Sequence, residues 1–113
     1  MIDGIGVDVV DIARFQESLE RTAGLREKLF TESERTLSTP SLAARFAAKE
    51  ALYKALSPSH GLAWHEAEVI NQPNGKPEFL FHGEIADLID GARVHLSLSH
   101  DAGIASAMVV LER

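Results

Sequence analysis

The sequence contains no cysteine, and this absence excludes several kinds of chemistry at once. Disulfide bonds, thiolate metal sites and a cysteine nucleophile are impossible, so any metal ion must bind through oxygen or imidazole. A zinc site is not expected, because no two histidines have the i, i+4 spacing of metal ligands on one helix. The five histidines are His60, His65, His82, His95 and His100.

Long apolar runs and an excess of positive charge are also absent. No stretch approaches the roughly 18 apolar residues of a membrane span, and no basic segment followed by an apolar run opens the chain. We therefore expect a cytoplasmic protein that does not associate with membranes. The formal net charge is −6. A general nucleic-acid binder needs a broad cationic surface, so we expect no nucleic-acid partner. Any anion must then bind at a local basic cluster or a metal.

The length and composition are those of a single domain, residues 1–113. A chain of 113 residues can form one core but is too short for two ordinary domains. Hydrophobic residues make up 45% and charged residues 25%, which is typical of a folded globular protein.

The pattern of apolar residues predicts both strands and helices. We expect a strand over residues 5–10, with odd-numbered residues on one face and even-numbered residues on the other. A helix should follow to about residue 22, with Asp11 as its N-cap. A second long helix should run over 41–56, between Thr39-Pro40 at its start and Ser57-Pro58 at its end.

Shorter elements complete the expected fold. Thr31 and Glu34 have capping-box spacing, which predicts a short helix beginning there. Downstream, the sequence predicts strands over 66–71 and 78–81, a helix over 84–88, and a hairpin of 95–100 and 104–111. The fold class is therefore α+β, with helices packed on a mainly antiparallel sheet.

Asp8 is the first candidate functional residue, because aspartate is rare in strands and here interrupts a β-branched run. A carboxylate at this position needs a partner. The alternatives are an aspartate at a sheet edge that faces solvent, or a cap for the following helix.

Glu50 is the second candidate, because it shares one sector of the long helix with Phe46 and Tyr53. Lys54 lies one turn further along the same helix. The alternative is a solvent-exposed Glu50–Lys54 pair, worth roughly a few tenths of a kcal/mol. Alanines occupy the adjacent face and would let another element approach closely. They are Ala43, Ala44, Ala47, Ala48, Ala51 and Ala55.

His100 is expected at the tip of the last hairpin, where hydroxyl, imidazole and carboxylate groups gather over residues 97–101. These groups could simply organise the turn. Without any reference to a family, two carboxylates, a helical lysine and several arginines suggest Mg²⁺ with a phosphate compound.

Four blocks of sequence sharpen this interpretation. They read GIGVDVVDI over Gly4–Ile12, RFAAKEALYKA over Arg45–Ala55, NGKP over Asn74–Pro77 and LSLSHD over Leu96–Asp101. In this order and spacing they resemble the holo-acyl-carrier-protein synthase family over essentially the whole chain. The resemblance implies a phosphopantetheinyl transferase fold formed by a single unit.

The resemblance also implies an activity and a metal site. The reaction would transfer 4′-phosphopantetheine from coenzyme A to a serine of an acyl carrier protein, releasing adenosine 3′,5′-bisphosphate, in support of fatty acid biosynthesis. Asp8 and Glu50 would be the Mg²⁺ ligands, and Lys54 would neutralise phosphate charge or aid proton transfer. The general base stays open between Glu50, a metal-bound water, and neutral Lys54 or His100.

Further residues are implied to contact coenzyme A. Arg45 and His100 are candidates for phosphate contacts, and the segments around Pro77 and Ser99 for packing against the nucleotide. Members of this size resemble homotrimers with active sites between subunits. The chain departs from the family over residues 55–61, where a short glycine-rich turn is usual.

Arg14 and Arg21 lie opposite the apolar stripe of the first helix and are the expected contact for an acidic carrier protein. The alternative is a solvated face balanced by Glu17 and Glu20. Two other functions remain open from sequence. One is a Mg²⁺-dependent phosphohydrolase using the same carboxylates, and the other is an oligomeric binding module without catalysis.

Overall fold

A computed structural model of the chain describes residues 1–56 and 63–113. Its elements, in chain order, are β1 (Ile2–Asp11), α1 (Ile12–Arg21), α2 (Leu25–Leu29), α3 (Thr39–Ala55), a 3₁₀ turn η1 (Trp64–Glu66), β2 (Ala67–Asn71), β3 (Pro77–Phe81), α4 (Gly83–Ile89), β4 (Arg93–Asp101) and β5 (Ile104–Glu112). The predicted α+β class is confirmed. Within the described ranges, no helix is long and apolar enough to cross a membrane.

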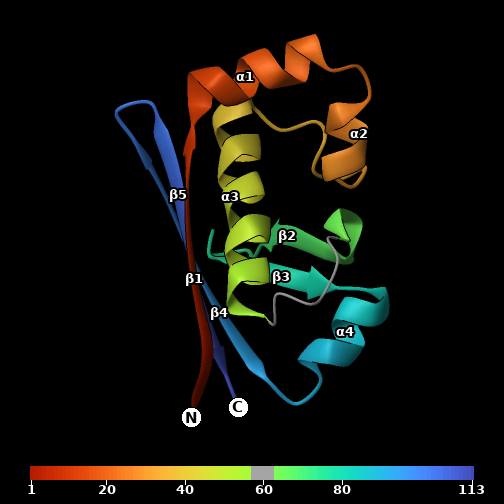
Figure 1. The fold of residues 1–113 in the computed structure, drawn as a ribbon, viewed down its shortest axis with the longest axis vertical. Helices are drawn as coiled ribbons and strands as arrows, with labels where there is room; N and C mark the ends of the chain where they lie inside the picture. The colour runs from red at the N-terminus through yellow and green to blue at the C-terminus, as the bar shows by residue number, and fades with distance from the viewer. Residues whose placement is uncertain (57–62) are drawn as a thin grey trace.

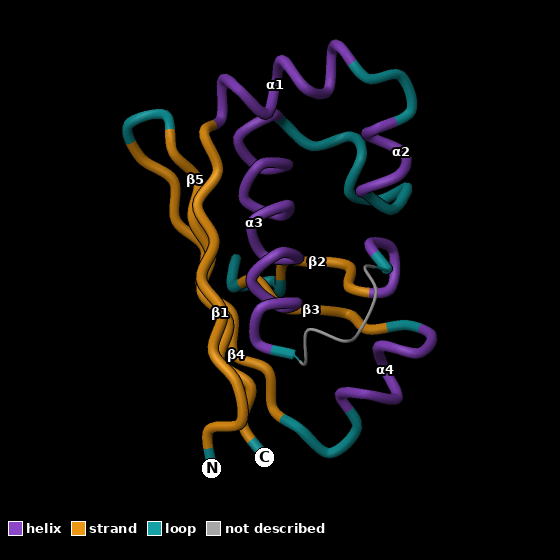
Figure 2. Tube along the Cα trace, viewed as in Figure 1, coloured by secondary structure: helices purple, strands orange, loops and turns teal. Residues whose placement is uncertain are grey.

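Two antiparallel sheets lie on different sides of the long helix α3. The larger has the strand order β1-β5-β4, and the smaller is the hairpin β2-β3. Figure 1 shows α3 running along the larger sheet, with α1 across one end of α3 and α4 near the opposite end. The secondary-structure view in Figure 2 shows β2 and β3 on the other side of α3. The helix is therefore the centre of the core.

Burial follows from this position of α3. Its apolar residues at the centre of the core are almost completely inaccessible, namely Leu42, Ala43, Ala47, Ala48, Ala51 and Leu52. The chain ends meet beside each other, since the N-terminal amine of Met1 donates to the carbonyl of Arg113 at 2.6 Å. The chain is thus held at the residue before β1 as well as along the pairing of β1 with β5.

Glycines bring β1 against the backbone of α3. A Cβ on Gly4 would lie 1.9 Å from the carbonyl oxygen of Ala55, and a Cβ on Gly6 would lie 1.8 Å from that of Ala51. Both distances are impossible for a real side chain, so only glycine permits this approach. The prediction that the alanine face of the helix admits a close neighbour is confirmed.

The alternation predicted for the first strand is also confirmed. The even-numbered residues Gly6 and Val10 are buried against the helix layer, whereas Ile5, Val7 and Val9 on the other face are 55%, 51% and 61% exposed. The strand is longer than the predicted 5–10, because pairing with β5 continues to Ile2 and Asp11.

The start of α1 agrees with prediction. The Asp11 side chain accepts a hydrogen bond from the backbone N–H of Arg14 at 2.9 Å, as an N-cap does. The other predicted elements are also present, with bounds shifted by one or a few residues. They are the strands β2 and β3, the helix α4 and the hairpin of β4 and β5.

The short helix predicted at Thr31 is wrong. Residues 32–36 form hydrogen-bonded turns. Glu34 does accept from the backbone N–H of Thr31 at 2.9 Å, but the Thr31 hydroxyl donates to Glu68 and so caps no helix. The Glu34 side chain is buried in the core, where it pairs with Lys49. It therefore does not take part in capping a helix at Thr31. The helix in this region is instead α2, which the sequence analysis did not predict.

Two boundaries of other elements differ from prediction. The N-cap of α3 is Ser38, not Thr39, and the Thr39 hydroxyl instead donates to Gln16 of α1. His100 does not form the hairpin tip but lies within β4, paired with Ala105. The predicted helix stop at Ser57-Pro58 lies outside the described residues.

Candidate active site

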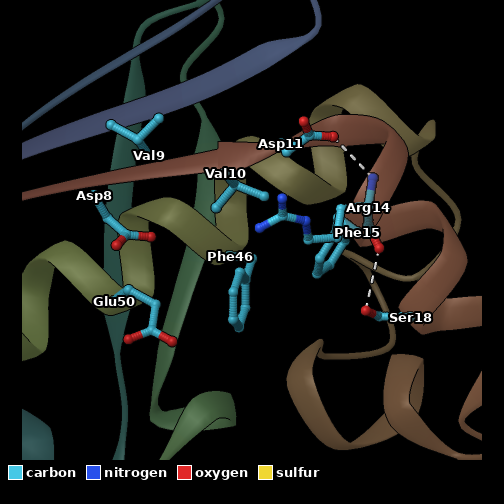
Figure 3. A pocket seen from close by; sticks show the side chains of 9 residues that line it. All are labelled: Asp8, Val9, Val10, Asp11, Arg14, Phe15, Ser18, Phe46 and Glu50. Carbon is cyan, nitrogen blue, oxygen red and sulfur yellow. Dashed lines mark hydrogen bonds between the residues drawn. The ribbon is translucent and has the colours of Figure 1, made fainter.

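A cavity of about 320 Å³ lies between β1, α1 and α3 (Figure 3). Its lining consists of Asp8, Val9, Val10, Asp11, Arg14, Phe15, Ser18, Phe46 and Glu50. The two predicted metal ligands therefore border one cavity, although they are 42 positions apart in the sequence. A metal ion held by both side chains would need them this close, and their role as its ligands stays a prediction.

The strand places Asp8 by continuing the row of Gly4 and Gly6. Since alternate residues of a strand face the same side, Asp8 also faces α3. Its side chain is 17% exposed, and Oδ1 accepts a hydrogen bond from Nζ of Lys54 at 3.0 Å. The same ammonium donates to the carbonyl of Val7 at 2.8 Å. Asp8 is thus neither a solvent-facing aspartate nor a helix cap, since Asp11 caps α1.

Glu50 lies on α3 one turn before Lys54. Burial raises the pKa of its carboxyl, the negative charge of Asp8 raises it further, and the positive charge of Lys54 opposes both effects. Figure 3 shows the Asp8 and Glu50 side chains side by side at the cavity, where the two carboxylates repel each other. Among the described residues, Lys54 pairs with Asp8, so an isolated Glu50–Lys54 pair is not observed.

Two mutually repelling carboxylates suit a divalent cation. Mg²⁺ is commonly held by one or two carboxylates together with substrate phosphates and water. In the described part of the chain, no group of three or more His, Asp or Glu side chains could hold a metal. A cation at Asp8 and Glu50 would therefore need ligands from a substrate or water, which fits Mg²⁺.

Arg14 brings positive charge to the same cavity. Figure 3 shows its side chain pointing into the cavity from the first turn of α1. The sequence analysis assigned Arg14 only to a surface patch with Arg21, because it lies opposite the apolar stripe. Arg21 is exposed and does not line the cavity. A phosphate compound would meet a cation as well as two carboxylates here.

Arg45 is not part of this cavity in a single chain. It is 6% exposed, and its Nη1 donates to the carbonyl of Ser41 at 3.4 Å. Its Nε is buried without a hydrogen-bond partner in the described part of the chain. Burial lowers the pKa of Arg45, against the opposing effect of the Glu34 carboxylate. The Glu34 carboxylate is therefore the negative charge that acts on Arg45. The predicted contact of Arg45 with phosphate stays a prediction.

The other predicted contacts of coenzyme A also lie apart from Asp8. Pro77 begins β3 and borders a separate cavity of about 170 Å³. Ser99 pairs with Ser106, which pairs with the exposed Val9, so Ser99 is on the outer face of the larger sheet. His100 is in β4, two strands away from β1. One chain therefore brings together only part of the predicted site.

One buried pair was missed from sequence. Lys49 and Glu34 form an ion pair with 2.8 Å between Nζ and Oε1, and their side chains are 0% and 1% exposed. Glu34 was interpreted only as part of a capping box. The sequence did contain a signal that Lys49 is buried. Its neighbours Ala48 and Ala51 belong to the alanine face that was expected to pack closely.

Comparison with known proteins identifies one family from the sequence. The family model described as the 4′-phosphopantetheinyl transferase superfamily matches residues 4–105. The holo-[acyl-carrier-protein] synthase of Leifsonia xyli subsp. xyli is 58% identical over 100% of this chain and 98% of its own length. That of Clavibacter sepedonicus is 55% identical over 99% and 97%.

Solved structures of similar proteins agree in fold. The holo-(acyl-carrier-protein) synthase of Bacillus anthracis, in complex with CoA (3′,5′-ADP), has a TM-score of 0.82 and 37% identity over 99% of this chain and 97% of its own. The synthase of Helicobacter pylori in complex with coenzyme A has a TM-score of 0.84 and 33% identity over 96% and 99%. That of Neisseria meningitidis has a TM-score of 0.91 and 30% identity over 100% of both chains.

Proposed function

The chain belongs to the 4′-phosphopantetheinyl transferase superfamily and, within it, to the holo-[acyl-carrier-protein] synthases, and we propose how its residues perform that transfer. The serine hydroxyl of an apo acyl carrier protein attacks the β-phosphorus of coenzyme A. The serine oxygen forms the new P–O bond, and the bond to the α-phosphate oxygen breaks. Adenosine 3′,5′-bisphosphate leaves, and the serine proton passes to a base. The observation that carries this proposal is the cavity shared by Asp8 and Glu50.

Asp8 and Glu50 would hold Mg²⁺, which supplies charge neutralisation for the diphosphate when it is bound. Lys54 keeps Asp8 oriented toward α3 through its 3.0 Å hydrogen bond, and its second bond to Val7 holds the ammonium in place. Arg14 offers a guanidinium to the phosphate oxygens from the opposite wall of the cavity.

Three side chains are candidates for the general base, namely Glu50, Lys54 and His100. Glu50 lines the cavity, where it would share its carboxylate with Mg²⁺. Lys54 donates hydrogen bonds to Asp8 and to the carbonyl of Val7. His100 lies in β4 and does not line the cavity of its own chain. Glu50 and Lys54 are thus the two candidates close to Asp8.

A homotrimer accounts for the separation of the predicted site residues. The outer face of the larger sheet exposes Ile5, Val7, Val9 and Met108, an apolar surface suited to burial against another copy. Arg45, Pro77, Ser99 and His100 do not line the Asp8–Glu50 cavity of their own chain. In the assembly, a neighbouring copy would supply these nucleotide contacts.

The carrier protein would dock on α1. Arg14 and Arg21 are both exposed on this helix, and their positive charge suits an acidic partner. Supply of holo carrier protein for fatty acid biosynthesis is the proposed cellular role. The cytoplasmic location stays a prediction that cell fractionation can check.

The decisive test is a mass spectrum of an apo carrier protein incubated with the enzyme, coenzyme A and Mg²⁺. We expect the carrier to gain about 340 Da, the mass of the transferred group. Removal of Mg²⁺ with a chelator should abolish the gain. Hydrolysis of coenzyme A without labelling of the carrier would instead favour a phosphohydrolase.

The metal ligands are tested with matched variants. Asp8→Ala and Glu50→Ala should both lose carrier labelling, whereas Asp3→Ala on the same strand and Glu84→Ala on α4 should retain it. Asp3 and Glu84 are exposed and lie outside the cavity. Intact labelling and metal dependence in both cavity variants would refute the assigned site. Absence of labelling by the wild type would instead favour a binding module without catalysis.

A further inference from the structure

Lys49 is a completely buried cation on the helix that carries Glu50. Its ammonium donates three hydrogen bonds, to the carbonyl of Leu29 at 3.0 Å, to Oε1 of Glu34 at 2.8 Å and to the carbonyl of Trp64 at 2.7 Å. An ammonium has three N–H donors, so each of them is used. The side chain is therefore held in a single direction.

Glu34 extends this contact to other elements. Its Oε1 also accepts from the backbone N–H of Thr31 at 2.9 Å, and its Oε2 accepts from that of Val69 at 2.9 Å. The Lys49–Glu34 pair thus joins α3 to the end of α2, to the turns after Thr31, to η1 and to β2. We refer to these five hydrogen bonds as the Lys49 clamp.

The contact on the opposite side of α3 is of a different kind. There, Gly4 and Gly6 of β1 lie against the backbone at Ala51 and Ala55. Apolar contact between small residues is non-directional, so it brings β1 and α3 together without strongly fixing the rotation of the helix. Lys54 adds directional contacts with β1, to the carbonyl of Val7 and to Asp8, but its side chain is 54% exposed, whereas Lys49 is completely buried.

We propose that Lys49 is a positioning residue, which acts through the Lys49 clamp to fix the rotation of α3 and so to keep Glu50 turned toward Asp8. Successive residues of an α-helix are separated by a rotation of about 100°. A rotation of α3 that turned Glu50 away from Asp8 would also turn the adjacent Lys49 and break its three hydrogen bonds. This inference rests on the proposed Mg²⁺ site.

Stability alone does not explain the clamp well. Replacing a buried ion pair with neutral or apolar groups of similar size is often neutral or stabilising, because the charges no longer have to be desolvated. Small displacements of a catalytic group are costly, since a shift of about 1 Å can reduce a rate roughly 100-fold. Positioning is thus the function that a buried pair next to Glu50 can best serve.

The test compares the wild type with the double variant Lys49→Met/Glu34→Gln. This variant removes both charges and preserves side-chain length, and the amide oxygen of Gln can accept from one of the two backbone donors, Thr31 or Val69. The matched control is Lys28→Met/Glu27→Gln, which removes the same charges from exposed positions of α2. The readout is the affinity for coenzyme A by calorimetry, with and without Mg²⁺, together with the Mg²⁺ concentration for half-maximal transfer.

We expect the double variant to lose about tenfold or more of the gain in coenzyme A affinity that Mg²⁺ confers, which is the loss seen when a residue that orients a metal ligand is replaced. Its affinity without Mg²⁺ should be unchanged, and its half-saturating Mg²⁺ should rise by a similar factor. The control should match the wild type. Circular dichroism and the fluorescence of the single tryptophan, Trp64, check that the double variant is folded.

Should the double variant fail to fold, Lys49→Arg replaces it, since it keeps the charge but not the three-way ammonium geometry. We expect the same loss of the Mg²⁺-dependent gain. If Mg²⁺ raises the coenzyme A affinity of a folded clamp variant as much as that of the wild type, this inference alone is overturned. No Mg²⁺-dependent gain in the wild type would overturn the proposed metal site, and this inference with it.

Discussion

Lys54 of α3 donates a hydrogen bond to Asp8 of β1, with 3.0 Å between Nζ and Oδ1, and joins two residues that are 46 positions apart. The bond crosses the contact where Gly4 and Gly6 bring strand and helix backbones together. Asp8 is therefore oriented by the same residue that moderates the negative charge around Glu50. Three predictions test this arrangement, and a fourth tests the proposed trimer.

Lys54→Met should reduce transfer activity strongly while leaving the fold intact. The variant removes the partner of Asp8 and one positive charge beside the cavity, so we expect kcat to fall by roughly 10²-fold. The free energy of unfolding should change by less than about 1 kcal/mol, because the ammonium is half exposed. Steady-state kinetics and urea denaturation measure the two effects. Wild-type activity in the variant would remove Lys54 from the mechanism.

Glu50→Gln should stabilise the metal-free protein at neutral pH. The pKa of Glu50 is raised in the folded state, so the folded state binds more protons than the unfolded state between the two pKa values. Stability contributed by this group is then lost as pH rises through that window. The advantage of the variant should disappear as pH falls toward about 4.3, the ordinary pKa of glutamate. Thermal unfolding in chelator at several pH values checks this, and a difference independent of pH would contradict it.

Gly6→Ala should destabilise the protein by about 1–3 kcal/mol or more, as other overpacked sites do. The added Cβ would lie 1.8 Å from the carbonyl oxygen of Ala51, which is backbone and cannot rotate away. Because β1 would have to move, we also expect weaker Mg²⁺-dependent transfer in whatever fraction folds. Urea denaturation gives the stability, and an unchanged midpoint would show that β1 and α3 are less tightly packed than described.

Val7→Glu should dissociate the proposed trimer. Val7 is 51% exposed on the outer face of the larger sheet, beside Met108 of β5, and a carboxylate there would have to be buried in an oligomer. Transfer should fall with the loss of the assembly. Light scattering during size exclusion measures the mass, with Ala13→Glu on the exposed side of α1 as the control. A mass of three chains in both variants would place the interface elsewhere.

Local pattern was sufficient to predict much of the fold. The alternation of β1, the capping of α1 by Asp11 and the long α3 helix depend on neighbouring residues, and all three are observed. The capping-box spacing of Thr31 and Glu34 gave a wrong prediction of a short helix. The hydrogen bond from the Thr31 N–H to Glu34, which is part of a capping box, forms here without a helix. The competing partner of Glu34 was Lys49, 15 residues away, which local pattern does not reveal.

By itself, the sequence determined the α+β class, the membership of the family and the identity of Asp8, Glu50 and Lys54 as the candidates. The tertiary structure decided which of them meet, turned Arg14 into the cavity, and separated Pro77, Ser99 and His100 from it. The physical reason is the range of the interactions. Periodicity and capping act over a few residues, whereas a buried ion pair or a two-carboxylate site exists only after distant segments have packed together.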